Sequence, residues 1–342
     1  MKKNLSLSLL LLLFLACSKN ADAVITVPPV EQPANFAKGA DISWITQQEA
    51  AGVKFYNSDG TQDDIFAILK KKGINSIRLR VWVNPKDGWN NTADVVAKAK
   101  RAKAADMKIL IDFHYSDSWA DPGKQTKPAA WNSLSFADLK TALATHTTEV
   151  MNQLKTNGIT PEWVQIGNET NDGMLWPDGR ATTNMANYAA LVSAGYEAVK
   201  TVSATSLVIA HVSNGYDTNL FKWNIGGLIA NNAKFDIIGI SLYPSASDWS
   251  TKNQQCLNTM TEMISTYNKK VMVVEVGMPA NDPANCKSFL ADLIAKTKAI
   301  PKEKGLGVFY WEPQCYKNWQ GYSLGAFDDT GKPSAAMDAF LN

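Results

Sequence analysis

The sequence has few of the side chains that bind transition metals. Only three histidines and four cysteines occur in 342 residues. They form no HExxH motif and no closely spaced Cys/His set. A G-x-S-x-G elbow is absent, and no glycine-rich phosphate motif follows the first predicted strand. These absences argue against a metal centre, a Ser-His-Asp hydrolase and a dinucleotide-binding protein, so we predict chemistry without a metal or cofactor.

An excess of either charge is also missing. Lysine and arginine number 34 against 32 aspartates and glutamates, which gives a formal net charge of +2. This balance predicts neither a nucleic-acid partner nor another polyanion. The apolar content of 45% is that of an ordinary globular protein, for which a monomer is the default. Eleven tryptophans predict either a large aromatic core or rings that stack on sugars.

The first residues do not belong to the predicted fold. Two lysines precede an apolar run from Leu5 to Ala16 that is too short to span a membrane. We interpret residues 1–16 as a signal peptide of the lipoprotein type, with Cys17 as the lipid-bearing residue. Residues 17–34 are polar and contain prolines, as a tether would. The expected location is the outer membrane of a Gram-negative-type cell, reached only through this lipid anchor, with ordinary secretion as the alternative.

Eight short apolar runs alternate with amphipathic helical patterns from Asn35 onward, and helix start signals occur at Thr92 and Ser135. No linker or repeat divides this region, so residues 35–342 are predicted to form one domain. The alternation predicts an α/β protein, a (β/α)₈ TIM barrel, rather than a doubly wound sheet. The predicted strands are Phe36–Trp44, Ser76–Val83, Lys108–His114, Trp163–Asn168, Leu207–His211, Asp236–Leu242, Val271–Glu275 and Gly307–Trp311.

Two of these strands end on a glutamate. Glu169 follows the fourth strand and Glu275 ends the seventh. Functional groups of such barrels lie at the C-terminal strand ends, and alternation along Val271, Val273 and Glu275 predicts that Glu275 points into the barrel mouth. Two carboxyls facing one cleft suit glycoside hydrolysis. The alternative, that each glutamate only satisfies a buried arginine or caps a helix, is competitive for either residue alone but not for both.

Other polar and aromatic side chains gather at the same strand ends. Arg78 and Arg80 share a face, and an arginine beside Glu275 would keep that carboxylate ionised. His114 is predicted to bond a sugar hydroxyl or the nucleophile, although a structural role is equally compatible with the sequence. Glu312 has the opposite parity to Trp311, so we interpret it as a supporting group. Trp311, directly at a strand end, is predicted to stack on a sugar.

Several motifs resemble the endo-β-1,4-galactanases of glycoside hydrolase family 53. The resemblance spans Phe36 to about Leu341 and rests on 38-KGAD-41, 77-IRLRVWVNP-85, 112-DFHYSDSWADP-122, 167-GNE-169, 175-LWPDGR-180 and 309-FYWEP-313. It implies a retaining endo-hydrolase of β-1,4-galactan, found in type I arabinogalactan and pectin. By position, Glu169 resembles the family's acid/base, Glu275 its nucleophile and Asn168 the residue that bonds the sugar 2-hydroxyl. The substrate-binding residues expected in all are Asp41, Arg78, Trp82, His114, Trp119, Asn168, His211, Asn214, Tyr243 and Trp311.

The chain departs from the family pattern at two places. The family's fifth strand often ends in His-x-Asp-Asn-Gly, whereas here Ser213 replaces the aspartate. Some bacterial members carry a long calcium-binding insertion after the eighth strand, but here the segment 313–333 is short and we expect no calcium.

Two alternatives to a galactanase stay open. The first is another barrel β-1,4-glycanase, such as a mannanase or xylanase, and the second is a surface lipoprotein that captures glycans without cutting them.

Cysteine pairing is limited by the odd number that remains after Cys17. Cys256, Cys286 and Cys315 can form at most one intramolecular bridge. Cys256 and Cys286 lie near the starts of the sixth and seventh helices, which are neighbours in a barrel, so we predict a disulfide between them. Cys315 is expected to be free.

Overall fold

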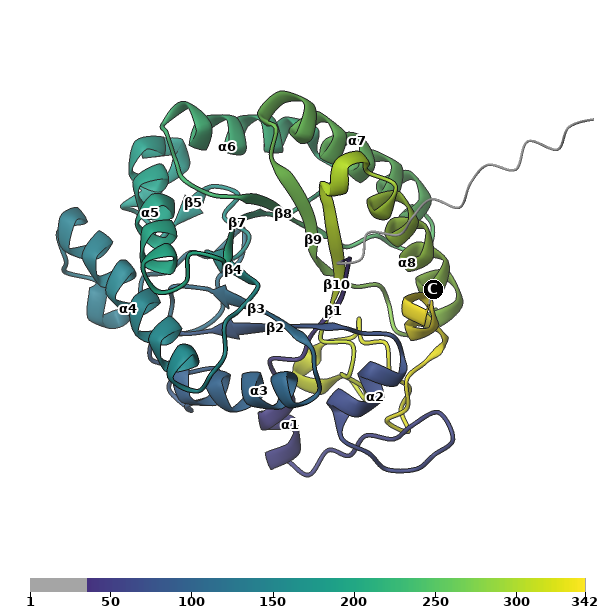
Figure 1. Cartoon of the computed structure of the whole chain (residues 1–342). Coiled ribbons are helices and arrows are strands. Elements are labelled where there is room, and N and C mark those ends of the chain that lie inside the picture. Colours follow the sequence, from purple (N-terminus) through teal and green to yellow (C-terminus); the bar gives the residue numbers. More distant parts are fainter. Residues whose placement is uncertain (1–35, 342) are drawn as a thin grey trace, which may run out of the picture. The chain divides into compact units, whose positions relative to one another are not determined.

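The structure is a computed structural model that describes residues 36–341. Eight parallel strands close into a barrel in the order β1-β10-β9-β8-β7-β4-β3-β2, and helices surround it (Figure 1). The predicted (β/α)₈ barrel is therefore confirmed, and each predicted strand overlaps an observed one. The barrel strands are β1 (Ala37–Asp41), β2 (Ser76–Val81), β3 (Lys108–Phe113), β4 (Trp163–Ile166), β7 (Leu207–Val212), β8 (Ile237–Leu242), β9 (Lys270–Val276) and β10 (Gly305–Trp311).

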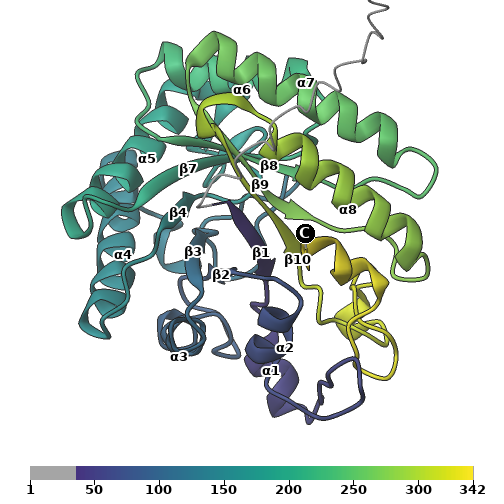
Figure 2. The ribbon, with the colours of Figure 1, turned by 45° about the vertical axis from the view of Figure 1, so that its right-hand side comes forward.

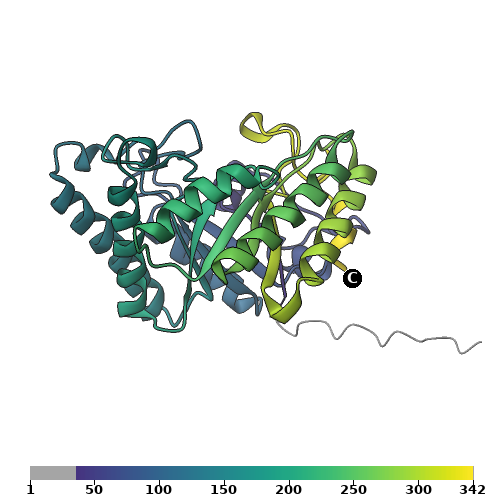
Figure 3. The ribbon, with the colours of Figure 1, turned by 90° about the horizontal axis from the view of Figure 1, so that it is seen from above.

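Helices connect successive strands and cover the outside of the barrel. Figure 3 shows the barrel from its side, with helices in front of the strands. The α-helices are α1 (Ile45–Ala50), α2 (Ile65–Lys71), α3 (Thr92–Ala104), α4 (Phe136–Thr156), α5 (Ala181–Val202), α6 (Thr218–Ala230), α7 (Trp249–Tyr267) and α8 (Pro283–Lys298). The shorter elements are the 3₁₀ turns η1 (Ala129–Trp131), η2 (Pro301–Glu303), η3 (Trp319–Gly321) and η4 (Ala335–Leu341), with a hairpin of β5 (Gly173–Met174) and β6 (Gly179–Arg180).

Local capping decides where the helices begin. Ser135 caps α4 as predicted, because its hydroxyl accepts the N–H of Asp138. The prediction for α3 is wrong by one residue, since Asn91 rather than Thr92 accepts the N–H of Asp94. The last element of the described chain is the 3₁₀ segment η4.

Side chains fill the barrel at the end where the strands begin. One buried cluster joins residues from seven strands, so this end is a packed core. Gly39 on β1 is required there, because a Cβ at this position would lie 2.0 Å from the ring of Phe309. The cluster consists of Ala37, Leu110, Trp163, Ile209, Ile237, Met272, Val274 and Phe309. We call the opposite end, where the strands finish, the mouth.

Both ends of the described chain lie at this filled end of the barrel. The side chain of Asn75, just before β2, donates a hydrogen bond to the carbonyl of Phe36. The C-terminal segment reaches the same place, because Asp338 forms an ion pair of 2.9 Å with Lys72. Figure 2 shows this segment, in yellow, beside β10 and α8. The predictions for residues 1–34, including the signal peptide, the lipid on Cys17 and the tether, lie outside the described residues.

The predicted disulfide is wrong. Cys256, Cys286 and Cys315 are all buried free thiols. Cys256 of α7 faces Gly215, after β7, whereas the sulfur of Cys286 of α8 lies 3.6 Å from the hydroxyl of Tyr310 on β10. Adjacent helix starts therefore do not bring the two sulfurs together, because each packs inward against a different strand.

A histidine buried outside the barrel predicts acid sensitivity. His146 of α4 packs against the rings of Phe113, Tyr115 and Trp131, and its Nε2 has no hydrogen-bond partner among residues 36–341. Burial lowers the pKa of His146 from 6.5 to about 4. The unfolded chain thus binds a proton more readily, so stability is lost as the pH falls from about 6.5 toward 4. We expect this residue to account for on the order of 2 kcal/mol of the difference in unfolding free energy between pH 7 and pH 4.5.

Urea unfolding of wild type and His146→Leu at both pH values measures this contribution. The variant should lose less stability on acidification than the wild type does. An equal loss in both proteins would contradict the assignment to His146.

Candidate active site

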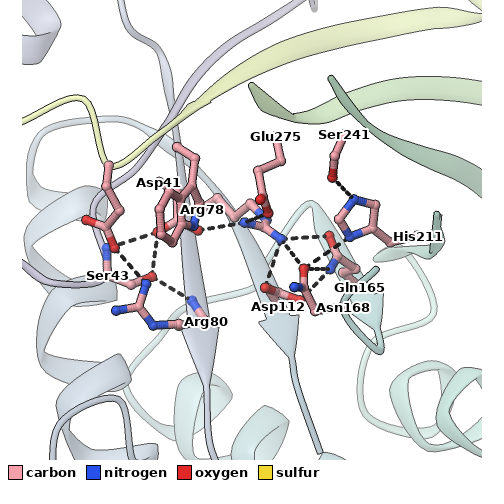
Figure 4. A network of polar contacts seen from close by, with 12 residues as sticks. Asp41, Ser43, Arg78, Arg80, Asp112, Gln165, Asn168, His211, Ser241 and Glu275 are labelled. Carbon is pink, nitrogen blue, oxygen red and sulfur yellow. Dashed lines mark hydrogen bonds and ion pairs between the residues drawn. The ribbon is translucent and has the colours of Figure 1, made fainter. Parts of the chain in front are cut away.

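Arg78 of β2 is the centre of a polar network at the mouth (Figure 4). Its side chain is 1% exposed. The Nη1 atom lies 2.8 Å from Oδ2 of Asp41 and 2.9 Å from Oε2 of Glu275, and Nη2 lies 2.8 Å from Oδ2 of Asp112. Carboxylates from β1, β3 and β9 therefore surround one cation. In a buried, weakly polarisable site these charges interact far more strongly than they would in water.

Two amide side chains of β4 and its loop complete this network. Nη2 of Arg78 donates to Oδ1 of Asn168 at 2.9 Å, and Nε2 of Gln165 donates to Asp112. One N–H of Asn168 donates to the carbonyl of Ala120. Within residues 36–341, this amide nitrogen has no second acceptor.

A β-bulge aims Glu275 into the mouth. Val271 and Val273 pack in the cluster between barrel and helices, whereas Met272 and Val274 fill the barrel interior. Regular alternation would then turn Glu275 outward. The register between β8 and β9 shifts between the pairs Ile240–Val273 and Ser241–Glu275, which reverses the facing of Glu275. The alternation predicted along β9 is therefore wrong, although the carboxylate reaches the expected place.

Glu275 has a cation and a hydroxyl donor in direct contact. Arg78 binds one carboxylate oxygen, and the hydroxyl of Tyr243 donates to the other at 2.6 Å. Burial raises the pKa of Glu275 above its ordinary value, while Arg78 and Tyr243 act in the opposite direction. The predicted arginine beside this glutamate is thus present.

Glu169 lies three residues after the end of β4 in a left-handed conformation. Its φ is 45°, which costs a non-glycine residue about 1 kcal/mol or more. Contacts to β7 hold this conformation: the N–H of Glu169 lies 3.2 Å from Nδ1 of His211, and the N–H of Thr170 donates to the His211 carbonyl at 2.9 Å. Burial raises the pKa of Glu169 to about 8, and the nearby charge of Glu275 adds to this effect.

The two carboxyls therefore differ in their ionisation. Burial raises the pKa of both carboxyls, but of the two only Glu275 forms an ion pair, with Arg78. A single proton shared by the pair consequently resides mainly on Glu169 below about pH 8. One protonated and one ionised carboxyl at the same mouth are suited to acid catalysis and to nucleophilic or base catalysis, respectively.

His114 is enclosed by other side chains. Its Nδ1 accepts hydrogen bonds from the indole N–H of Trp82 at 3.3 Å and the N–H of Ala120 at 3.1 Å. The proton is therefore on Nε2, which donates to Asp112 at 3.0 Å. Both nitrogens are used, so His114 bonds Asp112 and Trp82 and not Glu275, one of the two partners predicted for it. Its predicted contact with a sugar stays a prediction.

Arg80 supports the aromatic part of the mouth. Its Nη1 forms an ion pair of 2.6 Å with Glu312, which is fully buried. The guanidinium carbon lies 4.3 Å from the ring centroid of Trp119, and the rings of Trp44 and Trp82 lie within 5.3 Å. The carboxylate of Glu312 thus pairs with the second arginine of β2, while its N–H donates to the carbonyl of Asp41 at 2.8 Å.

Aromatic rings line a cleft of about 400 Å³ beside this network. Trp311, at the end of β10, pairs in register with Asp41 of β1, which connects the cleft to the polar network. The ring of Trp311 lies 5.8 Å from that of Trp119. Partly exposed indoles in a cleft offer flat apolar surfaces to a ligand. The lining residues are Trp44, Gln47, Asp87, Gln320, Gly321, Tyr322 and four further tryptophans, Trp82, Trp89, Trp119 and Trp311.

The remaining residues predicted to bind substrate differ in how exposed they are. Asp41 and His211 are fully buried among other side chains. Tyr243 is partly exposed and Asn214 is exposed at the end of β7. Direct contact of any of these residues with a sugar stays a prediction.

Several residues that contribute to the site were not predicted from the sequence. Gln165 shares a face with Glu169, and Ser241 lies two residues before Tyr243 on β8, so alternation along the strand could have indicated both. Trp44 carries no such signal because it follows the end of β1. Within residues 36–341, no three histidine, cysteine, aspartate or glutamate side chains are grouped as metal ligands, and metal-free chemistry stays a prediction. None of the helices described is long and apolar enough to cross a bilayer.

A closed parallel barrel with two unequal carboxyls and an aromatic cleft at its mouth is the architecture of a (β/α)₈ glycoside hydrolase. Comparison with known families agrees, because the model of glycosyl hydrolase family 53 matches residues 37–340. The chain belongs to this family, as the resemblance of its motifs indicated, and it is a glycosidase.

Individual relatives cover nearly the same region. The arabinogalactan endo-beta-1,4-galactanase of Thermothelomyces thermophilus is 36% identical over 306 residues, which are 82% of this chain and 90% of that protein. A probable arabinogalactan endo-beta-1,4-galactanase A of Neosartorya fischeri is 35% identical over 303 residues, 82% of this chain and 85% of that protein. A solved fungal beta-1,4-galactanase has a TM-score of 0.83 at 33% identity and covers 90% of this chain and 100% of its own. The GH53 catalytic domain of Ignisphaera aggregans has a TM-score of 0.83 at 31% identity. The match covers 92% of this chain and 97% of that domain.

Proposed function

We propose that the protein is a retaining endo-β-1,4-galactanase in which Glu169 is the acid/base and Glu275 the nucleophile. The observation that carries this proposal is the unequal environment of the two carboxyls. Glu275 contacts Arg78 and Tyr243, whereas Glu169 keeps its proton to about pH 8. Retaining glycosidases need this combination of an ionised nucleophile and a protonated acid.

The proposed reaction has two displacements. The carboxylate of Glu275 attacks the anomeric carbon while Glu169 gives its proton to the glycosidic oxygen, so the C–O bond breaks and a galactosyl ester of Glu275 forms. Glu169, now ionised, takes a proton from water, whose oxygen attacks the same carbon and releases Glu275. Formation of the ester removes the charge of Glu275, which lowers the pKa of Glu169 and favours its role as a base.

Galactan is proposed as the substrate because relatives at 35–36% identity carry that activity in their names. The aromatic cleft is compatible with a chain of galactose units, whose apolar faces stack on indole rings. Another barrel β-1,4-glycanase and a glycan-capturing lipoprotein are the alternatives.

Release of reducing sugar from β-1,4-galactan, with mannan and xylan as controls, tests the substrate. Release from galactan alone supports the proposal, and a preference for mannan or xylan would assign a different glycanase activity. Binding of galactan without release would indicate a capture protein. Proton NMR of the first-formed product tests the stereochemistry, because a retaining enzyme releases the β-anomer and an inverting enzyme the α-anomer.

We further propose export as a monomeric lipoprotein, on the basis of the apolar run Leu5–Ala16 followed by Cys17. The wild-type chain should partition with membranes, and Cys17→Ser should not acquire lipid. Equal recovery of both chains in the soluble fraction would leave ordinary secretion as the better explanation. Light scattering of the detergent-solubilised protein tests the monomer.

A further inference from the structure

A groove lies on the outside of the barrel at the filled end, where α7 and α8 lead into β9 and β10. The two helices run side by side (Figure 1), and the groove between them has a volume of about 610 Å³. It is lined by Leu257 and Ile264 of α7 and by Ala299, Ile300 and Pro301, which follow α8. Leu257 and Ile264 are only half-buried, and Ala299 and Pro301 are exposed. The groove is therefore apolar and open to solvent.

Lysines surround this apolar surface. The segments 268–270, between α7 and β9, and 296–304, at the end of α8 and before β10, contain six lysines and one acid, Glu303. The whole chain has a net charge of only +2, so this is a local concentration of positive charge. The lysines are Lys269, Lys270, Lys296, Lys298, Lys302 and Lys304. We call these lysines and the apolar surface between them the basic groove.

The stabilisation of helix ends does not account for all of these lysines. At other connections of the filled end the lysine binds a helix-terminal carbonyl, as Lys103 does with Gly158 and Lys155 with Val202. By contrast, Lys270 and Lys302 are exposed, and their side chains have no partner within residues 36–341. Two charges of the basic groove are therefore available to an external anion.

Nearby carboxylates neutralise only part of this charge. Asp292 of α8 pairs with Lys296, whereas Glu262 of α7 pairs with Lys222 of α6, outside the basic groove. Glu303 is exposed. After Asp292 and Glu303 are set against the six lysines, four positive charges are left beside the apolar surface. This combination fits a ligand that has both a negative group and an apolar part.

The described chain begins beside the basic groove. Nζ of Lys298 lies 5.4 Å from the centre of the Phe36 ring, and Ala299 of the groove is the next residue. Preceding residues join the domain at Phe36, so a lipid anchor on Cys17, proposed above, would attach at the same end of the domain as these lysines. A membrane is therefore a more suitable partner for this end than for the mouth.

We propose that the basic groove binds the surface of an anionic phospholipid membrane. A phospholipid supplies a phosphate for Lys270 and Lys302 and an acyl chain for the apolar surface near Leu257. A polyanion would leave the apolar surface exposed, and an apolar peptide would leave the lysines unpaired. Binding of this kind holds the filled end against the membrane and turns the mouth toward the polysaccharide. It does not depend on which sugar the mouth cleaves.

Vesicle sedimentation tests this surface with the full chain carrying Cys17→Ser, which cannot be lipidated. The vesicles consist of phosphatidylcholine alone or of an equal mixture with phosphatidylglycerol. We expect phosphatidylglycerol to strengthen binding and added salt to weaken it. In Lys270→Gln/Lys302→Gln the affinity for the mixed vesicles should fall roughly tenfold or more, because two charges near the anionic surface are lost. No gain from phosphatidylglycerol in the parent chain would overturn the proposal.

Lys100→Gln/Lys140→Gln is the matched control for this loss. Lys100 of α3 and Lys140 of α4 are also exposed and without a side-chain partner in the described chain. Their replacement removes the same charge from other faces, so the affinity should change by less than about twofold. The apolar run Leu5–Ala16 is identical in all these chains and cancels in the comparison. Equal losses in both double variants would mean that net charge, and not the basic groove, causes binding.

A fluorescent label tests whether acyl chains enter the groove. Ser265→Cys places a thiol at an exposed position of the groove, while the native Cys256, Cys286 and Cys315 are buried. A bimane label at residue 265 should be quenched by brominated acyl chains in the mixed vesicles. The same label on Ser133→Cys, exposed in the loop from β3 to α4 at the mouth, should not be. Quenching at the mouth, or binding without quenching at residue 265, would overturn the proposal.

Discussion

Glu275→Gln is expected to lower kcat on galactan by roughly 10⁴-fold or more, because no covalent galactosyl intermediate can form on an amide. The amide has nearly the shape of the carboxylate: its oxygen can still accept from Arg78, while its NH2 group can donate to the hydroxyl oxygen of Tyr243. Substrate binding should therefore change far less than turnover does. Initial rates and galacto-oligosaccharide affinity by calorimetry measure the two effects separately.

The same substitution should alter the ionisation of Glu169. The charge of Glu275 is one of the causes that raise the pKa of Glu169 to about 8. Its removal should lower that pKa, which NMR titration of labelled glutamate would detect in the inactive variant. Glu162→Gln, an exposed carboxylate at the filled end of the barrel, is the matched control and should keep full activity. A Glu275→Gln enzyme that still hydrolyses galactan at a comparable rate would require a different nucleophile.

Arg78→Met is expected to destabilise the fold by about 3–5 kcal/mol near neutral pH, since it leaves buried carboxylates without their cation. Asp41 and Asp112 are fully buried and Glu275 is 6% exposed, so water cannot replace the guanidinium. The loss of unfolding free energy should be smaller at lower pH. Without their cation the buried carboxylates take up protons more readily, and protonation removes the repulsion between them. Urea unfolding at pH 7 and pH 5 measures both the loss and its pH dependence.

Arg101→Met is the control for this effect. Arg101 also bridges two carboxylates, Glu49 and Asp64, but its side chain is 30% exposed. Its replacement should cost less than about 1 kcal/mol at either pH. Similar losses for the two arginines would mean that burial of the Arg78 network adds nothing to its strength.

The sequence was sufficient to predict the barrel because eight apolar runs and their intervening helices are local patterns. It was not sufficient to predict where the regular pattern breaks. Alternation through Val271 and Val273 put Glu275 on the inner face, yet both valines face the helices and a bulge turns the glutamate inward. A bulge depends on the pairing of two strands, which no single stretch of sequence contains.

The residues that hold the charged side chains of the site in place could not be predicted from the sequence for a similar reason. Ser241 and Gln165 are uncharged residues whose importance comes from partners on other strands. The pairing of Cys256 and Cys286 was mispredicted because helix position says nothing about which way each sulfur points. Charged residues at strand ends could be predicted from the sequence. Burying an ionised group at the end of an apolar strand costs free energy, so such a residue indicates a specific role.

The filled end of the barrel has a practical consequence for attachment of the enzyme. Phe36 and Asp338 both lie at that end, so the described chain begins and ends on the side away from the cleft. A polysaccharide must reach and leave the carboxyls of Glu169 and Glu275 by the opposite opening, because packed side chains close the barrel below them. Immobilisation on a solid support through a residue at the filled end, such as Asp338, should therefore leave long polysaccharide chains free to approach, whereas linkage through a loop at the mouth should block them.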